Sequence, residues 1–347
     1  MEIGIGLDAG LNLSWEDQAE LSQEAAKLGY TSVWTPEGTG HDSFHVCVHR
    51  WGATEQVVAD GLVTGIAVSP VALRTPVAMA MAGATASDLT RGHFIMGIGS
   101  GGLYRQEGQH TYGLGRIPVV ALMRDYLTTI KGLLNGETLN YEGKTVTLHG
   151  VRLGIKPSFA VPVYLGALGP MMLRLGGELA DGISLNWCTP EQVAWSRKLV
   201  NEGESRSGRE KSSVVLSEYI RVCIDDDVKV ARRAFVRALM NYALGSSVPS
   251  DTERALGYRG HFERMGFADA LKSLDEMRNK GATEDSLIDA FPDELATQVG
   301  YFGPASGAGA AFRSLAQGLD VAIVRVVAAR PGLDSVRDVM QACKPGL

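Results

Sequence analysis

The sequence predicts an α/β protein with the fold of a (β/α)8 TIM barrel with insertions, formed by one domain over residues 1–347. Short β-branched segments alternate with helical patterns, which is typical of a parallel sheet. Eight strand candidates over about 300 residues fit a closed barrel. The first strand is followed by Asp8-Ala9-Gly10-Leu11-Asn12, which lacks the GxGxxG spacing usual in an open nucleotide-binding sheet. No linker or internal repeat divides the chain.

Eight segments have the apolar, β-branched composition of buried strands. In chain order they are residues 3–7, 31–35, 61–68, 93–98, 163–166, 182–185, 214–224 and 321–327.

Helical patterns follow most of these strands, and several begin with a recognisable cap. Ser14 precedes a helix over 15–28, with Asp17 at the capping-box position. Thr75-Pro76 and Thr189-Pro190 place proline at the first helical position. Apolar residues at helical spacing predict further helices over 118–135 and 227–244, and Tyr242 belongs to the apolar face of the second. Shorter helices are predicted over residues 51–59, 170–179, 268–280 and 335–343.

Two segments interrupt the alternation and predict insertions. Residues 136–155 alternate with period two around Gly143, which indicates a hairpin. Residues 245–320 contain helical stretches but no clear long strand, which indicates a helical insert before the last strand.

Net charge, apolar stretches and cysteine spacing argue against several classes of protein, including nucleic-acid-binding and membrane-spanning ones. The formal net charge of -6 and pI of about 5.7 disfavour a protein that coats nucleic acid. The longest apolar stretch, residues 61–86, is broken by Pro70, Arg74 and Pro76, so no membrane span is expected. The acidic N-terminus lacks the apolar run of a signal peptide, and the four cysteines form no CxxC pair. We therefore expect a cytoplasmic protein without a disulfide framework.

No metal site is expected. His41, His45 and His49 recur every four residues, but no HExxH pattern or cysteine supports them, so they predict a histidine stripe on a helix. Cys188 has no base near it in sequence and is expected to be a small buried residue.

Glycine gathers where the predicted strands end, which is the active-site face of a barrel. Gly97, Gly99, Gly101 and Gly102 would let the backbone approach a ligand closely, or would only serve turns that need positive φ. Residues 166–169 precede a helix that starts near Pro170, where free amides can bind an anion. Arg174 would add charge there, although a plain turn with a solvated arginine remains the alternative. These strand ends are poor in nucleophile–base pairs, which favours a ligand that brings its own chemistry.

Taken together, these motifs resemble the bacterial-luciferase-like flavin and deazaflavin oxidoreductases. The resemblance is strongest to the branch of the coenzyme F420-dependent methylenetetrahydromethanopterin reductases. It covers most of residues 1–230 and the final strand. The stretches that carry it are EAAKLGYTSVW (24–34), TGIAVS (64–69), RTP (74–76), LTRG (89–92), GIGSG (97–101) and, most specifically, YLGALGPMMLRLGGELADGISLNW (164–187).

The resemblance implies a luciferase-like barrel with its cofactor at these strand ends. A non-proline cis peptide behind the ring would fall at Gly65–Ile66, next to Thr64. The ring would be bordered by Gly99, Ser100 and Gly101. The cofactor phosphate would lie at Gly166, Ala167, Leu168 and Gly169, and near Gly176-Gly177. A homodimer is also implied.

Glu37 is the candidate catalytic residue. It follows the second strand, where the reductase branch has an acidic residue, and would shape the pocket or relay a proton. The glucose-6-phosphate dehydrogenases of the family have an acidic–histidine pair there and a glutamate after the fourth strand. Here these positions are Glu37-Gly38 and Gly102, which puts a sugar substrate in doubt.

The resulting expectation is an oxidoreductase that transfers a hydride between coenzyme F420 and a small organic substrate. Two alternatives remain open: an FMN-dependent luciferase-like monooxygenase supplied with reduced flavin by a partner, and a non-enzymatic barrel that binds a cofactor.

Overall fold

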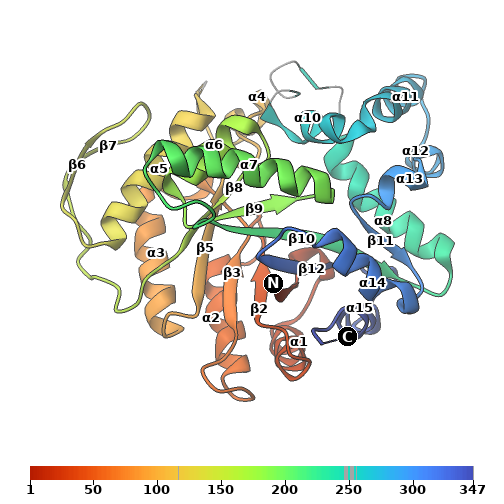
Figure 1. Ribbon diagram of the computed structural model, residues 1–347, viewed down its shortest axis with the longest axis horizontal. Coiled ribbons are helices and arrows are strands. Elements are labelled where there is room, and N and C mark those ends of the chain that lie inside the picture. The colour runs from red at the N-terminus through yellow and green to blue at the C-terminus, as the bar shows by residue number, and fades with distance from the viewer. Residues whose placement is uncertain (116, 246–248, 251–253, 255, 347) are drawn as a thin grey trace.

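The computed structural model describes residues 1–115, 117–245, 249–250, 254 and 256–346. Within this part of the chain, eight parallel strands close into a barrel, which confirms the predicted fold (Figure 1). The barrel closes because β1 pairs with β12 and β9 pairs with β10. In barrel order the strands are β1 (Glu2–Gly6), β2 (Ser32–Thr35), β3 (Val63–Ile66), β5 (Phe94–Gly99), β8 (Val163–Gly166), β9 (Gly182–Asn186), β10 (Val215–Ile224) and β12 (Val321–Val326).

Helices surround the strands, and the predicted caps begin three of them. Ser14 and Asp17 form the expected capping box, and the side chains of Thr75 and Thr189 accept from the amides of Ala78 and Gln192. The long outer helices are α1 (Trp15–Lys27), α2 (Ser43–Thr54), α3 (Pro76–Leu89), α5 (Val119–Leu134), α6 (Pro170–Leu179), α7 (Pro190–Arg206), α8 (Val228–Ala243), α14 (Ala305–Leu315) and α15 (Asp334–Ala342). Short helical segments are η1 (Ala9–Leu11), η2 (Val71–Leu73) and α4 (Gln106–Thr111).

Helix α2 begins earlier than the predicted helix over 51–59. Asp42 caps it by accepting from the amides of Phe44 and His45. Phe44, Cys47 and Trp51 then form its buried face. Of the predicted histidine stripe, only His45 and His49 lie on this helix, with the His45 side chain 85% exposed, because His41 precedes the Asp42 cap. Among the described residues, no group of three His, Cys, Asp or Glu is placed to hold a metal ion.

The hairpin indicated by residues 136–155 is formed by β6 (Leu139–Glu142) and β7 (Thr147–Val151), which pair antiparallel outside the barrel. Asp125 on α5 holds its turn by accepting from Tyr141 and from Thr145 and Val146.

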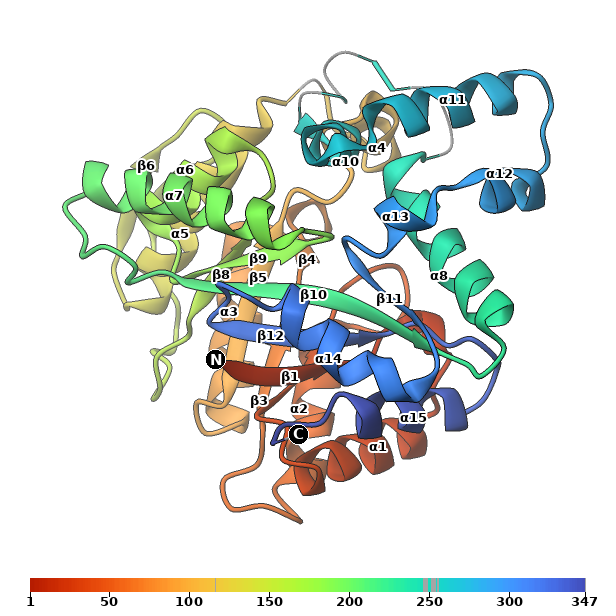
Figure 2. The same ribbon diagram turned by 45° about the vertical axis from the view of Figure 1, so that its right-hand side comes forward.

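The segment 245–320 differs from the prediction at its C-terminal end. A short strand, β11 (Gly300–Gly303), extends the sheet by pairing with the second half of β10. Its sequence, Gly-Tyr-Phe-Gly, has glycine at both ends and no β-branched residue, which is why sequence reasoning missed this strand. The helical elements before it are α10 (Tyr258–Phe262), η3 (Glu263–Phe267), α11 (Ala268–Asn279), α12 (Glu284–Ala290) and α13 (Asp293–Ala296). They lie beside α8, on one side of the barrel (Figure 2).

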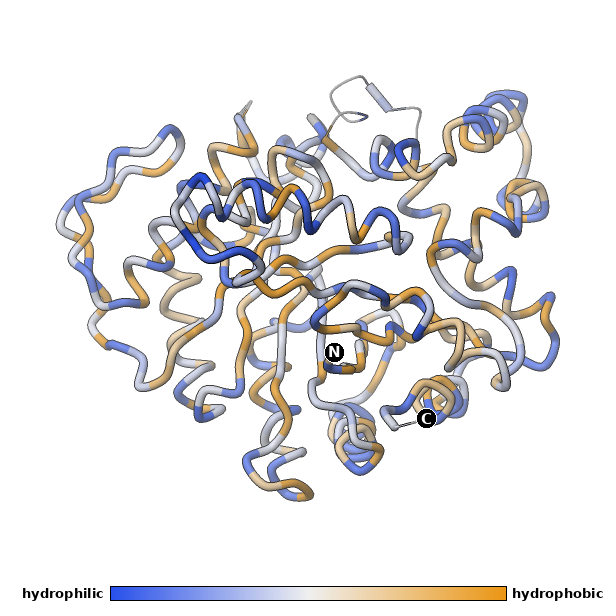
Figure 3. Tube along the Cα trace, viewed as in Figure 1, coloured by the Kyte–Doolittle hydropathy of each residue, from blue (hydrophilic) through white to orange (hydrophobic). Residues whose placement is uncertain are grey.

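Two apolar regions hold these parts together. The main core lies between the strands and the outer helices, and hydrophobic stretches follow the barrel strands in Figure 3. A second core joins α8 to α10–α13 and centres on aromatic rings of Trp187, Phe235, Phe262 and Phe267. Among the described residues, no helix combines the length and apolar character that crossing a bilayer requires.

Candidate active site

A cavity of about 690 Å³ lies where the barrel strands end. It is lined by residues of the loops after β2, β3, β5 and β8 and by residues within β9, β10 and β12, at the end of the barrel where the active site of a (β/α)8 fold lies. The predicted site residues that line it are Glu37, Gly99, Ser100, Gly101, Gly166, Ala167, Leu168 and Gly169.

The bulge after the third strand lies two residues later than predicted. Gly65 and Ile66 remain in regular β3, in register with Trp34 and Thr35. Gly65 faces the Trp34 ring. Thr64, Gly65 and Ile66 are therefore strand residues that do not line the cavity. The residues that line it after β3 are Ala67, Val68 and Pro70. The cis peptide bond is Ala67–Val68, which corrects the assignment to Gly65–Ile66. β4 (Ser69–Pro70) then resumes pairing with β5.

Three glycines make room for this bulge. A Cβ built at Gly97 would lie 1.9 Å from the carbonyl oxygen of Ile66. Cβ atoms built at Gly99 and Gly166 would lie 2.5 and 3.2 Å from the Val68 side chain. Gly97 and Gly99 on β5 therefore leave no room for a side chain, whereas a Cβ at Gly166 would need only a small shift of Val68. This glycine wall forms one side of the cavity.

An open amide site adjoins the glycine wall. Gly169 caps α6 and Pro170 opens it, so the free amides of the first turn face the cavity rim. Arg174, predicted to add charge here, instead pairs with Glu202 on α7 at 2.8 Å. Arg264 approaches from the other side and donates to the Leu168 carbonyl at 3.1 Å. Sequence reasoning missed Arg264 because it belongs to the segment without a motif.

Gly176 and Gly177 have a structural role and do not line the cavity, which corrects their assignment to the phosphate site. Both are buried inside α6, and a Cβ on Gly177 would lie 2.1 Å from the Val200 carbonyl oxygen. They let α6 approach α7 and β9 closely, and their amides lie within the helix rather than at its free end.

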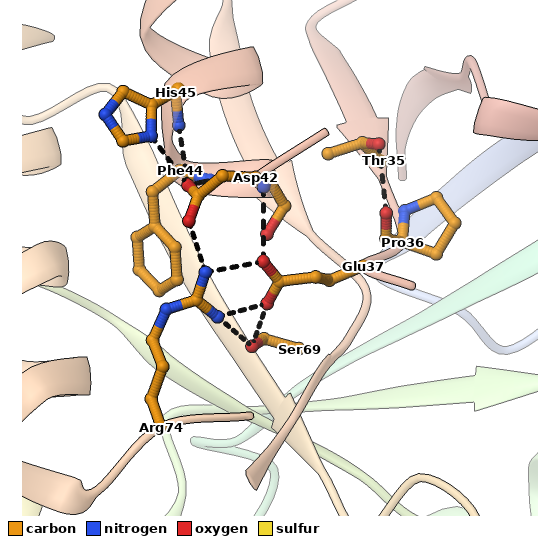
Figure 4. A network of polar contacts seen from close by, with 9 residues as sticks. Thr35, Pro36, Glu37, Asp42, Phe44, His45, Ser69 and Arg74 are labelled. Carbon is orange, nitrogen blue, oxygen red and sulfur yellow. Dashed lines mark hydrogen bonds and ion pairs between the residues drawn. The ribbon is translucent and has the colours of Figure 1, made fainter. Parts of the chain in front are cut away.

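Glu37 is held by a dense set of polar contacts at the cavity edge (Figure 4). Arg74 donates to both of its oxygens, at 2.6 and 2.7 Å. Ser69 donates to Oε2, and the Ser43 amide donates to Oε1 at 3.3 Å. Arg74 also contacts Asp42, and hydrogen bonding to Glu37 raises the pKa of Arg74. Because four donors occupy the carboxylate, this geometry favours the pocket-shaping role of Glu37 over proton relay.

A second wall of the cavity is polar and aromatic. It comes from β9, β10, β12, α8 and α10, and Asn186, Tyr242, Tyr258 and Arg325 line the cavity there. Asn186 donates to the Tyr258 hydroxyl at 2.6 Å and accepts from Arg221 at 2.6 Å. No motif marked this wall in the sequence, beyond Asn186 in the stretch that carried the resemblance. Tyr242 was placed on an apolar helix face, where its ring does pack on Trp187, but its hydroxyl accepts from Arg325 at 3.5 Å.

A cluster of buried titratable groups adjoins this wall, and Glu218 of this cluster lines the cavity itself. Cys188 donates its amide to Glu218 at 2.6 Å, and its thiol lies 3.9 Å from His261. Burial raises the pKa of the Cys188 thiol well above its usual value, so Cys188 is the small buried residue that was expected. Burial also raises the pKa of Glu218 to about 8 and lowers the pKa of His261 to about 4.

The raised pKa of Glu218 predicts a stability change with pH. Between its ordinary pKa of 4.5 and about 8, the folded protein keeps a proton that the unfolded chain has released. The free energy of unfolding should therefore fall as pH rises through this window, by up to about 1.4 kcal/mol for each pH unit. His261 acts in the opposite direction, and its contribution is lost as pH falls from 6.5 to about 4. Urea unfolding at pH 6 and pH 9 should show a decline in the wild type that Glu218→Gln largely removes. A decline of equal size in both proteins would contradict this assignment.

The family model described as "Luciferase-like monooxygenase" matches residues 2–318. The chain therefore belongs to this family, and the residues that carried the resemblance lie in a barrel of the expected kind.

Named relatives and a solved structure show which members of the family this chain is similar to. The chain is 27% identical over 315 residues to a putative coenzyme F420-dependent oxidoreductase from Mycobacterium tuberculosis, covering 84% of this chain and 86% of the relative. It is 27% identical over 241 residues to the 5,10-methylenetetrahydromethanopterin reductase of Archaeoglobus fulgidus, covering 65% and 68%. A solved coenzyme F420-dependent tetrahydromethanopterin reductase from Methanopyrus kandleri superposes with a TM-score of 0.74 at 20% identity, covering 100% of this chain and 98% of that one. The protein is thus an enzyme of the luciferase-like family, which sets aside the non-enzymatic barrel.

Proposed function

We propose that the protein is a coenzyme F420-dependent oxidoreductase that transfers a hydride between the deazaflavin and a small organic substrate. The observation that carries the proposal is the glycine wall beside an open helix N-terminus, in a chain related to proteins that are named for this coenzyme. The glycines let the Val68 bulge lie close against β5 and β8, so that it can offer a surface to a planar ring, and the free amides at the start of α6 offer donors to a phosphate.

The cavity fits such a group. Its volume lies within the usual range of about 300–1,000 Å³ for small-molecule sites. The ring would lie along Val68 and Gly99, and the phosphate-bearing tail would lie at Gly166–Gly169 near Arg264. When bound, the deazaflavin supplies the carbon that gives or accepts the hydride.

The side chains of this enzyme contribute orientation and exclusion of water. Val119, Met172 and Ile323 give the cavity apolar surface, and Glu37 with Arg74 fixes the loop after β2 at its edge. Holding two reactants at close range in a dry site lowers the entropic part of the barrier.

A paired ligand titration tests the proposal. Fluorescence or calorimetry with F420 and with FMN should give micromolar or tighter binding of F420 and markedly weaker binding of FMN. The deazaflavin without its phosphate-bearing tail should bind about tenfold or more weakly than F420, because charge-assisted hydrogen bonds to the amides are lost. Preference for FMN, together with oxygen consumption, would favour the luciferase-like monooxygenase. Absence of binding for both would reject the cofactor site.

The cytoplasmic location and the homodimer expected from the sequence stay predictions. Size-exclusion chromatography with light scattering measures the oligomeric state directly.

A further inference from the structure

The polar wall holds more positive than negative charge. Arg221 is 1% exposed, and Arg325 pairs with Asp8 beside it. Arg221 donates to neutral Asn186, its guanidinium lies 3.8 Å from the centroid of the Trp187 ring, and its Nη2 has no hydrogen-bond partner among the described residues. Glu218 also lines the cavity and interacts with Arg221, but burial raises its pKa to about 8, so at neutral pH it keeps its proton. Within this described cluster, two guanidiniums therefore face one ionised carboxylate, that of Asp8. A buried cation without an anion is costly, so this wall favours negative charge on whatever oxygen lies next to it.

The oxygen in that position is the hydroxyl of Tyr242. Tyr242 lines the cavity, accepts from Arg325 Nη1 at 3.5 Å, and has the Arg221 guanidinium 5.0 Å from its ring centroid. Burial alone would raise its pKa, yet the charges of Arg221 and Arg325 outweigh burial and lower the pKa of Tyr242 below 10. The groups that face Tyr242 are Asp8, Arg221, Tyr258 and Arg325, with Trp187 as an apolar neighbour.

The location of Tyr242 matters for chemistry. β12, which carries Arg325, stands across the barrel from β5, which carries Gly97 and Gly99 of the glycine wall, and β10 lies next to β12. A substrate between a ring on the glycine wall and the polar wall would have its reacting carbon toward the ring and a polar atom toward Tyr242. The rest of the cavity surface is largely apolar, with Val120, Met171 and Leu256 among its residues.

We infer that Tyr242 is the proton donor for reduction of a small, largely apolar ketone, and the proton acceptor for oxidation of the matching secondary alcohol. This inference rests on the proposed function. When bound, the reduced deazaflavin would supply the hydride: its own C–H bond would break and its ring would be oxidised, as a C–H bond forms at the carbonyl carbon and the π electron pair moves onto oxygen. The Tyr242 O–H bond breaks as the substrate O–H bond forms, leaving an alcohol and a phenolate. Arg221 and Arg325 stabilise that phenolate until solvent returns the proton. A neutral carbonyl gains negative charge on its oxygen as hydride adds to its carbon, so a proton donor between two guanidiniums suits this group.

The first part of the test needs no cofactor. Ultraviolet difference titration of the ligand-free protein follows tyrosinate formation as pH rises. We expect the wild type to show one tyrosine that ionises below pH 10, absent in Tyr242→Phe and present in Tyr141→Phe. Tyr141 is a matched control because it lies on the hairpin outside the barrel, where its hydroxyl donates to Asp125 of α5. Equal titration curves for the wild type and Tyr242→Phe would overturn the inference.

The second part measures turnover with probe substrates. Protein loaded with reduced F420 is mixed with acetone or cyclohexanone, and F420 reoxidation is followed by absorbance. We expect Tyr242→Phe to lower kcat by about 10²-fold or more, the usual size of a lost general acid, with F420 affinity within about threefold of wild type. Tyr141→Phe should keep wild-type kcat.

The outcomes separate the two claims. Turnover of Tyr242→Phe within threefold of the wild type overturns the role of Tyr242. F420 binding without reoxidation by any probe ketone overturns the substrate class. Failure to bind F420 rejects the proposed function itself, while the ligand-free titration still decides whether Tyr242 has the inferred environment.

Discussion

Replacing Gly97 by alanine should abolish F420 binding and lower the free energy of unfolding by about 3 kcal/mol or more. The added Cβ would lie 1.9 Å from the Ile66 carbonyl oxygen, which is a backbone atom and cannot rotate away. Either β5 or the segment after β3 must therefore move. Both options displace Val68 and Gly99, which form the wall proposed to face the ring.

The measurement is urea unfolding together with an F420 titration. Gly52→Ala is the matched control, because Gly52 is inside α2 and a Cβ there meets nothing within 4 Å. Alanine at a helical interior position should raise stability by about 0.5–1 kcal/mol and leave F420 affinity unchanged. Wild-type stability and affinity in Gly97→Ala would show that the glycine wall tolerates a side chain, and would remove the main support for the ring site.

Local chemistry made much of the barrel predictable. The helix predicted over 170–179 coincides with α6, because Gly169-Pro170 defines its start and a β-branched strand follows soon after. Thr75-Pro76 and Thr189-Pro190 defined two more starts in the same way. These helix starts depend only on residues that are neighbours in the sequence, so they can be predicted without knowledge of tertiary contacts.

The site was less predictable because its roles depend on contacts between distant segments. Gly97 and Gly177 are both glycines at close approaches, but one meets the backbone at the cavity and the other meets α7. Arg174 lies one turn inside α6, yet pairs with Glu202 on the neighbouring helix. Tyr242 fits an apolar helix face by spacing, and only the folded chain brings Arg221 and Arg325 to its ring and hydroxyl. Periodicity reports which face of an element is buried, but not which polar group it meets there.

Replacing Arg74 by methionine should lower the free energy of unfolding by about 3 kcal/mol. The Glu37 side chain is 3% exposed, and Arg74 is the cation that contacts both of its oxygens. Methionine keeps an apolar stem against Phe44 but leaves a buried carboxylate with only the Ser69 hydroxyl and the Ser43 amide. Urea unfolding at neutral pH measures the loss.

Glu37→Gln and the double variant Glu37→Gln/Arg74→Met complete a cycle that also decides the role of Glu37. Glutamine alone should cost about 1 kcal/mol, because Arg74 keeps Asp42 and is partly exposed to water. The double variant should recover most of the loss seen with Arg74→Met, since no buried charge remains unpaired.

If Glu37 shapes the pocket, Glu37→Gln should keep kcat within about tenfold of wild type with an unchanged pH profile. A folded Glu37→Gln enzyme whose kcat falls by about 10²-fold or more would instead make Glu37 the proton relay, because general acid–base groups contribute at that level. In that case the four donors around its carboxylate would have to separate during turnover, and Arg74→Met would change the pH profile as well as stability.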